Sequence, residues 1–95
     1  MLIVHARLTG KADKRSELLA LVQDLAKSSR LEKGCHSYRF CEDTEVQNDF
    51  IFVEEWESQD ALDRHAQQPH FLSFQDKVAN LVTAPPDIRA YQVGE

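Results

Sequence analysis

The sequence predicts a small α+β domain: one antiparallel sheet with helices packed against it. Two patterns carry this prediction. In some stretches apolar and polar residues alternate, which is typical of half-buried strands, and in others apolar residues recur every three or four positions, which is typical of amphipathic helices. The length of 95 residues is enough for one domain and too short for two. We therefore treat residues 1–95 as a single domain.

The first half of the chain predicts a strand, a helix and a second strand. In Leu2–Thr9 the even-numbered residues are apolar and share one face, and Gly10 ends the strand. Residues 13–29 predict an amphipathic helix, because apolar residues recur there at helical spacing in a charged background. After the interruption at Lys33-Gly34, residues 35–42 predict the second strand.

The second half predicts a third strand, two short helices and a last strand. A polar stretch over residues 43–49 forms the turn before the third strand, and Ser58 is the predicted N-cap of the first short helix. The predicted ranges are 50–56 for the strand, up to about 67 for the first helix, 70–82 for the second helix and 88–93 for the last strand. The resulting order β-α-β-β-α-β is the ferredoxin-like arrangement.

Composition excludes several classes of function. The formal net charge is -5, with 16 acidic residues against 11 Lys and Arg, and no basic cluster is present, so nucleic acid is not an expected partner. The N-terminus lacks the pattern of a signal peptide, and no apolar run approaches the roughly 20 residues that span a bilayer. Cys35 and Cys41 are six residues apart in one predicted strand, about 20 Å along the chain, too far for a disulfide. A soluble, cytoplasmic protein with free thiols is expected.

The third predicted strand also indicates a homodimer. Phe50-Ile51-Phe52-Val53 is apolar on both faces, whereas a two-layer domain buries one face of its sheet. The helices of one chain cover one face, so we expect a second copy to cover the other, sheet against sheet. His5 and Arg7 would lie at or near that interface.

A set of motifs resembles the antibiotic biosynthesis monooxygenase (ABM) domain family over nearly the whole chain. The motifs are Glu54-x-Trp56 with Ser58, Ala61-Leu62, the helical His65, Pro69-His70-Phe71, and Glu32-Lys33-Gly34-Cys35-His36-Ser37-Tyr38 upstream. The resemblance implies a dimeric α+β barrel with one pocket per subunit between helices and sheet. It also implies oxidation of a quinol-like or polyketide-like aromatic by O2 without metal or flavin. Such chemistry needs a dry cavity, a base and donors for the developing oxyanion.

Metals and haem are not expected as cofactors. His65 and His70 are five residues apart, so they lack the i,i+4 spacing of a helical metal pair, and no acid or Cys stands at ligand spacing beside them. The haem-degrading branch of the superfamily uses an Asn where this chain has Ala6, and a ligating His where Phe74 and Gln75 stand. Only its Trp is shared, as Trp56.

Three residues are candidate catalytic groups. His65 and His70 are natural general bases near neutral pH, although each could instead fasten the helices to the sheet by a hydrogen bond. Glu54 could act as a base or orient a His, or it could be the partner of a helix N-terminus, since a buried acid requires some partner.

Five further residues are candidate substrate contacts. Trp56 is expected either to stack on a flat aromatic substrate or to belong to the core. His36 and Tyr38 share a predicted strand face and could bind a phenolic oxygen, with a place at a strand end or dimer rim as the alternative. Phe71 and Phe74 lie on one helix face, as core or pocket wall.

Two other functions remain open at this stage. The first is an isomerase of a small phosphorylated dicarbonyl, as in the relatives that process autoinducer-2-type signals, with Lys33, Arg39 and Arg89 available for the phosphate. The second is a non-catalytic ligand-binding dimer, an analogy at the level of fold alone.

Overall fold

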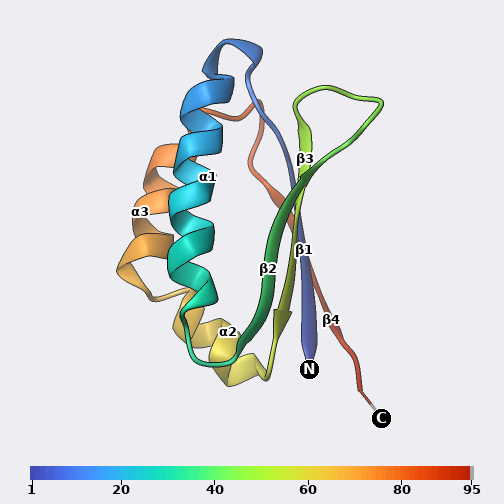
Figure 1. Ribbon diagram of the computed structural model, residues 1–95, viewed down its shortest axis with the longest axis vertical. Coiled ribbons are helices and arrows are strands. Elements are labelled where there is room, and N and C mark those ends of the chain that lie inside the picture. Colours follow the sequence, from blue (N-terminus) through green and yellow to red (C-terminus); the bar gives the residue numbers. More distant parts are fainter. Residues whose placement is uncertain (95) are drawn as a thin grey trace.

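The computed structural model describes residues 1–94, and its elements follow the predicted order (Figure 1). They are β1 (Leu2–Thr9), a 3-10 turn η1 (Ala12–Lys14), α1 (Arg15–Arg30), β2 (Cys35–Glu42), β3 (Asp49–Trp56), α2 (Gln59–His65), α3 (Pro69–Val78) and β4 (Asp87–Gln92). Among residues 1–94, no helix is long and apolar enough to cross a membrane.

The four strands form one antiparallel sheet in the order β2-β3-β1-β4. β1 lies between β3 and β4, and β2 is an edge strand beside β3. Strands that are sequential in the chain are therefore partly separated in the sheet, as the β-α-β-β-α-β connectivity requires. The predicted ferredoxin-like α+β fold is confirmed.

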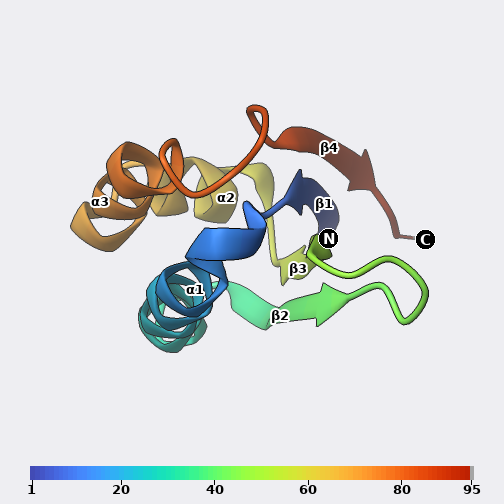
Figure 2. The same cartoon turned by 90° about the horizontal axis from the view of Figure 1, so that it is seen from above.

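All three helices cover the same face of the sheet (Figures 1 and 2). The even-numbered residues of β1 point to this face and are buried, as the alternation predicts. Their cross-strand partners on β3 include Phe52, opposite Ala6, and Glu54, opposite Val4. Leu18, Val22 and Leu25 of α1 pack onto this layer. A core thus forms between helices and sheet, and Glu54 is the acidic residue buried within it.

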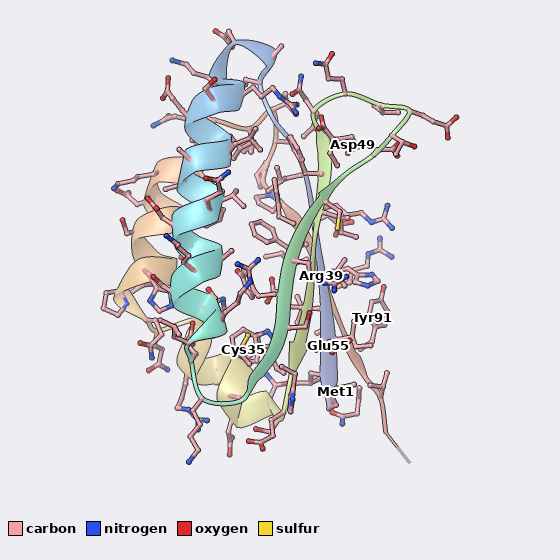
Figure 3. All side chains as sticks on the ribbon, viewed as in Figure 1. Met1, Cys35, Arg39, Asp49, Glu55 and Tyr91 are labelled. Atoms are coloured by element: carbon pink, nitrogen blue, oxygen red, sulfur yellow. The ribbon has the colours of Figure 1, made fainter. Side chains whose placement is uncertain are left out.

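Residues 1–94 leave the opposite face of the sheet uncovered. Ile51 and Val53 of β3 point to it and are only partly buried. Figure 3 shows Cys35 on the helix side of the sheet and Tyr91 on the other side. All six residues of β4 are exposed, because the helices do not reach this edge strand (Figure 2).

Two local features differ from the sequence prediction. α3 ends at Val78 rather than at 82, because the chain leaves the helix to bond with the end of β1: Val82 forms an isolated bridge with Gly10, and the Thr83 amide donates to the Thr9 carbonyl at 2.9 Å. A β-bulge between Cys35 and Ser37 interrupts the alternation of β2. His36, within this bulge, is exposed and does not share the buried environment of Tyr38.

Candidate active site

A cavity of about 690 Å³ lies between the sheet and the helices. Its floor comes from β1 and β3, one wall from α2 and α3, and its rim from residues 82–86 and Ile88. Most of the lining side chains are apolar: Val4, Ala6, Leu8, Phe52, Leu62, Phe71, Phe74 and Val78. This volume and composition are typical of sites for small organic ligands.

Five polar side chains line the cavity: Tyr38, Glu54, His65, Gln75 and Thr83. Among the described residues, no Lys or Arg contributes to the lining. The site therefore offers hydrogen-bonding and proton-transfer groups to a ligand but no cation for a phosphate or carboxylate.

Glu54 projects from β3 into this apolar space. The indole Nε1 of Trp56 donates a hydrogen bond to Oε1 of Glu54 at 2.9 Å. Burial raises the pKa of Glu54 to about 7, with the charge of Glu32 acting in the same direction and the Trp56 hydrogen bond opposing it. A carboxyl group with this pKa can both hold and release a proton at neutral pH.

Trp56 supports the site from behind the cavity wall. Its side chain is fully buried and does not line the cavity. The indole packs against the His65 ring, with centroids 4.6 Å apart, while its N–H is used by Glu54. In this structure Trp56 therefore fixes Glu54 and His65, and the expected direct stacking on a substrate is not the contact that the geometry provides.

Tyr38 contributes a buried phenol from β2. Burial is the main cause that raises its pKa above the ordinary value, and the charge of Glu54 adds to the effect. The phenol is thus protonated across the neutral range. Its ring packs against those of Phe52, Trp56 and His65, with centroids 5.5–6.2 Å apart. Tyr38 thus contacts both apolar and polar residues of the site.

His65 and His70 converge on a single carboxylate oxygen. Glu32 lies just after α1, His65 is the last residue of α2 and His70 is the second residue of α3. Glu32 Oε2 is 2.7 Å from His65 Nδ1 and 2.6 Å from His70 Nε2. The exposed fraction of the side chain rises from 3% for His65 to 11% for Glu32 and 24% for His70. The group leads from the buried site toward the surface.

The other ring nitrogen of His65 is free of hydrogen bonds within residues 1–94. Nε2 is buried and has no partner there, while the ring itself lines the cavity. Burial lowers the pKa of His65, and the Glu32 carboxylate opposes this effect without cancelling it. His65 is consequently an uncharged imidazole at neutral pH, the form that can accept a proton.

Glu32, His65 and His70 are also the one group of three within residues 1–94 whose donor atoms lie close enough, within 4.8 Å, to hold a metal ion. The contacts of 2.6 and 2.7 Å have the length of charge-assisted hydrogen bonds. We describe the group as a hydrogen-bonded triad and assign no metal to it.

Comparison with known proteins shows the family of this chain. Residues 1–77 match the model of the family described as antibiotic biosynthesis monooxygenase. The chain belongs to the ABM family.

Three relatives of this ABM chain are similar over most of its length. The uncharacterized protein sll1783 of Synechocystis is 39% identical over 94 residues, which cover 99% of this chain but 64% of that protein. The chain thus spans less than two thirds of sll1783. YcnE of Bacillus subtilis is 32% identical over the full length of both proteins. Rv0793 of Mycobacterium tuberculosis is 35% identical over 82 residues, 86% of this chain and 80% of that protein. YcnE and Rv0793 both carry the name "Putative monooxygenase".

Solved structures share the fold. The structure of Rv0793 superposes with a TM-score of 0.92 at 31% identity and covers 99% of this chain and 95% of that one. A structure from Deinococcus radiodurans that bears the name of the ABM family has a TM-score of 0.93, also at 31% identity, and covers 100% and 94% of the two chains. The ABM fold therefore extends through the whole described chain, including the last strand that lies outside the matched range.

The structure brings five of the eight predicted site residues to the cavity. Those that line it are Glu54, His65, Tyr38, Phe71 and Phe74, and those that do not are Trp56, His70 and His36. His70 is one step removed, through Glu32, whereas the bulge in β2 leaves His36 at the surface.

Glu32 is a polar residue of the site that the sequence did not single out, and the same holds for Gln75 and Thr83 of the cavity lining. Glu32 is 33 residues from His65 and 38 from His70, so no local spacing connects them. The signal available was its place in the ABM segment Glu32-Lys33-Gly34-Cys35. Gly34, with φ of +88°, turns the chain there from α1 into β2.

Proposed function

We propose that this ABM chain is a cofactor-independent monooxygenase that oxidises a neutral, quinol-like or polyketide-like aromatic with O2. The observation that carries the proposal is the combination of a large apolar cavity with a neutral imidazole, a carboxyl group of pKa about 7 and a protonated phenol on its walls. The monooxygenase names of YcnE and Rv0793 support the reaction class.

The lining favours an uncharged aromatic substrate. Phe52, Phe71 and Phe74 provide flat apolar surface on which aromatic rings pack well. A phosphorylated dicarbonyl would need a cation, and Lys33, Arg39 and Arg89 do not line the cavity. This distribution of charge supports the oxygenase over the isomerase.

In the proposed reaction, His65 removes the phenolic or benzylic proton of the substrate. The resulting anion gives one electron to O2, and the substrate radical and superoxide combine into a carbon-bound peroxide anion, which takes back the proton held by His65 and becomes a hydroperoxide. Heterolysis of the O–O bond with loss of the remaining C–H proton leaves a carbonyl and one water. One oxygen atom stays on the product, the other leaves as water, and all electrons come from the substrate. The apolar cavity favours these steps by keeping bulk water away from the anion.

Glu54 and Tyr38 have complementary parts in this scheme. Below pH 7 Glu54 is mostly protonated, so it can supply the proton that turns the departing hydroxide into water. The Tyr38 phenol can donate a hydrogen bond to the substrate oxyanion. Because both groups are neutral before reaction, they add no negative charge that would oppose formation of the substrate anion.

We also propose that the protein is a homodimer in the cytoplasm. The half-buried Ile51 and Val53 on the uncovered sheet face support a second copy there. Cys35 and Cys41 are free thiols, which supports a reducing compartment.

The test is oxygen uptake by EDTA-treated protein with a panel of hydroquinones, naphthohydroquinones and anthrones. We expect saturable uptake without added cofactor, and a drop of about 10²–10⁴-fold in His65→Ala, the usual contribution of a general base. His36→Ala is the matched control, because this His is exposed and outside the cavity. Uptake equal to the autoxidation blank across the panel would contradict the proposal.

A further inference from the structure

The proposed reaction uses His65 but leaves Glu32 and His70 without a role. Both residues are partly buried and neither lines the cavity. A carboxylate can only accept hydrogen bonds. Each imidazole nitrogen that touches Glu32 Oε2 must therefore carry a hydrogen: Nδ1 of His65 at 2.7 Å and Nε2 of His70 at 2.6 Å.

This constraint determines the tautomer of His65. A neutral imidazole carries one hydrogen, so a hydrogen on Nδ1 leaves Nε2 with a free lone pair. The opposite tautomer, which free histidine prefers in water, would turn the Nδ1 lone pair toward the carboxylate at 2.7 Å. It would also leave a buried N–H at Nε2 without an acceptor among residues 1–94. Both consequences are unfavourable.

His70 has a different position in the triad. It comes from the first turn of α3, it donates to the oxygen that His65 also uses, and its own ring does not line the cavity. A second donor on Oε2 holds the Glu32 side chain against His65 although Glu32 lies in a loop between α1 and β2.

We propose that Glu32 is a positioning residue that locks His65 in the Nδ1–H tautomer, which leaves Nε2 as the unprotonated, basic nitrogen, and that His70 anchors the Glu32 carboxylate. The catalytic consequence rests on the proposed function, whereas the tautomer is a property of the resting protein. His70 is thereby assigned to positioning rather than to direct proton abstraction.

Three titratable groups face His65 from different elements: Glu32 from the loop after α1, His70 from α3 and Tyr38 from β2. Glu54 of β3 lines the same cavity and is bonded to Trp56, whose indole packs against the His65 ring. Of the three facing groups, Glu32 raises the pKa of His65 and His70 lowers it. Loss of Glu32 should therefore lower the pKa of His65 further, and the acid limb of the rate profile should move to lower pH.

The first experiment measures the tautomer by ¹⁵N–¹H correlation of the imidazole rings in EDTA-treated protein without substrate. We expect the Nδ1–H form for His65 in the parent. In Glu32→Gln and Glu32→Ala the share of Nε2–H should rise. Gln keeps the size of the side chain but its amide can donate as well as accept. Glu45→Ala, an exposed loop acid, is the matched control. An unchanged Nδ1–H form of His65 in both folded Glu32 variants overturns the proposal.

His70 is tested by two substitutions. His70→Gln places an amide N–H near the former Nε2 and should preserve the tautomer of His65, whereas His70→Leu removes the donor and should shift it. If His70→Gln and His70→Leu gave the same His65 imidazole spectrum, the anchoring role of His70 would be contradicted. His36→Ala again controls for the loss of a histidine.

The second experiment separates this proposal from the oxygenase. With an oxidised substrate in hand, Glu32→Gln should lower kcat about 10-fold or more with little change in KM, and move the acid limb of kcat/KM to lower pH. A purely structural role would lower the rate without moving that limb. If the tautomer shifts in the Glu32 variants but no substrate drives oxygen uptake, the positioning stands and the oxygenase fails.

Discussion

The chemistry of the cavity depends on two residues whose pKa values move in opposite directions for the same reason. Burial raises the pKa of Glu54 to about 7 and lowers that of His65. In both cases the uncharged form is favoured, because an apolar site disfavours charge. The cavity thus presents an acid and a base that are both neutral in the same pH range, which is the condition that a paired acid and base require.

Glu54→Gln is predicted to change how stability depends on pH. The folded protein keeps a proton on Glu54 that the unfolded chain releases from about pH 4.5 upward, so the free energy of unfolding falls as the pH rises from 4.5 to 7. The difference in pKa corresponds to about 3 kcal/mol. His65, with its lowered pKa, gives the opposite slope below pH 6.5.

The quantity to measure is therefore the difference between parent and variant in the free energy of urea unfolding from pH 4.5 to 8. Glu54→Gln should gain relative stability toward high pH, and Glu45→Gln should not. Parallel curves for parent and Glu54→Gln would refute the shift.

Site residues that local patterns define were predictable from the sequence, whereas those that tertiary structure defines were not. Alternation in β3 placed Glu54 on the helix face, where it is found. The same alternation failed for His36, because a bulge cannot be read from period two. Glu32 was missed because its partners are more than 30 residues away. Trp56 was placed on the correct face, but only packing shows that it lies behind the cavity wall.

Among the elements, α2 is the shortest helix and the one that delivers His65. It has seven residues, too few to be stable by itself. Two features define its start: the Ser58 hydroxyl accepts a hydrogen bond from the Ala61 amide at 3.2 Å, and Ala61 is buried against the loop at Gly34. His65 follows one turn later, so the cap also sets the position of the base.

Ser58→Ala should lower the free energy of unfolding by about 1 kcal/mol, the usual cost of losing an N-cap. Ser58→Asp should restore it, since a carboxylate caps equally well and favours the helix N-terminus. Thermal or urea unfolding of the three proteins checks this. If Ala and Asp variants were equally destabilised, the hydroxyl would not be acting as a cap.

The link from α1 to β2 depends on Gly34. Its φ of +88° is unfavourable for any residue with a side chain, and a Cβ there would stand 2.6 Å from the Cβ of Ala61. Gly34→Ala should cost about 1–2 kcal/mol from the backbone alone, with more from the clash, whereas the exposed neighbour Lys33→Ala should be nearly neutral. Urea unfolding measures both. If only Lys33→Ala lowered the free energy of unfolding, the role of Gly34 in the link from α1 to β2 would be contradicted.

Most elements were predictable from sequence because each has a period and an end signal of its own. α3 is the informative exception. The apolar pattern continues through Leu81 and Val82, so it predicted a helix to 82, and both residues are indeed buried. Helical order nevertheless ends at Val78, because the following backbone bonds with the end of β1. The apolar pattern thus predicted the burial of Leu81 and Val82 correctly, but their helical structure incorrectly.

For the whole molecule, the uncovered sheet face is the feature that a single chain leaves unexplained. Ile3, Ile51 and Val53 lie on it among polar residues, and each is partly exposed. β3 is apolar on both faces although the helices of this chain protect only one. A second copy placed sheet against sheet would bury these three residues and leave the cavities on the outer sides of the assembly.

Val53→Lys is therefore predicted to convert a dimer into a monomer. Val53 faces His5 on β1 and Arg39 on β2 across the sheet, so the new amine would place a third basic group in one row. Like charges would then be buried at the contact between copies. Val46→Lys, in the exposed loop between β2 and β3, introduces the same charge away from this face and should leave the assembly unchanged. Sedimentation equilibrium at micromolar protein should give twice the chain mass for the parent and Val46→Lys, and the chain mass for Val53→Lys with an unchanged circular dichroism spectrum. If the parent sedimented as a monomer, the proposed homodimer would be wrong. The cavity with its acid and base would be unaffected, because it lies within one chain.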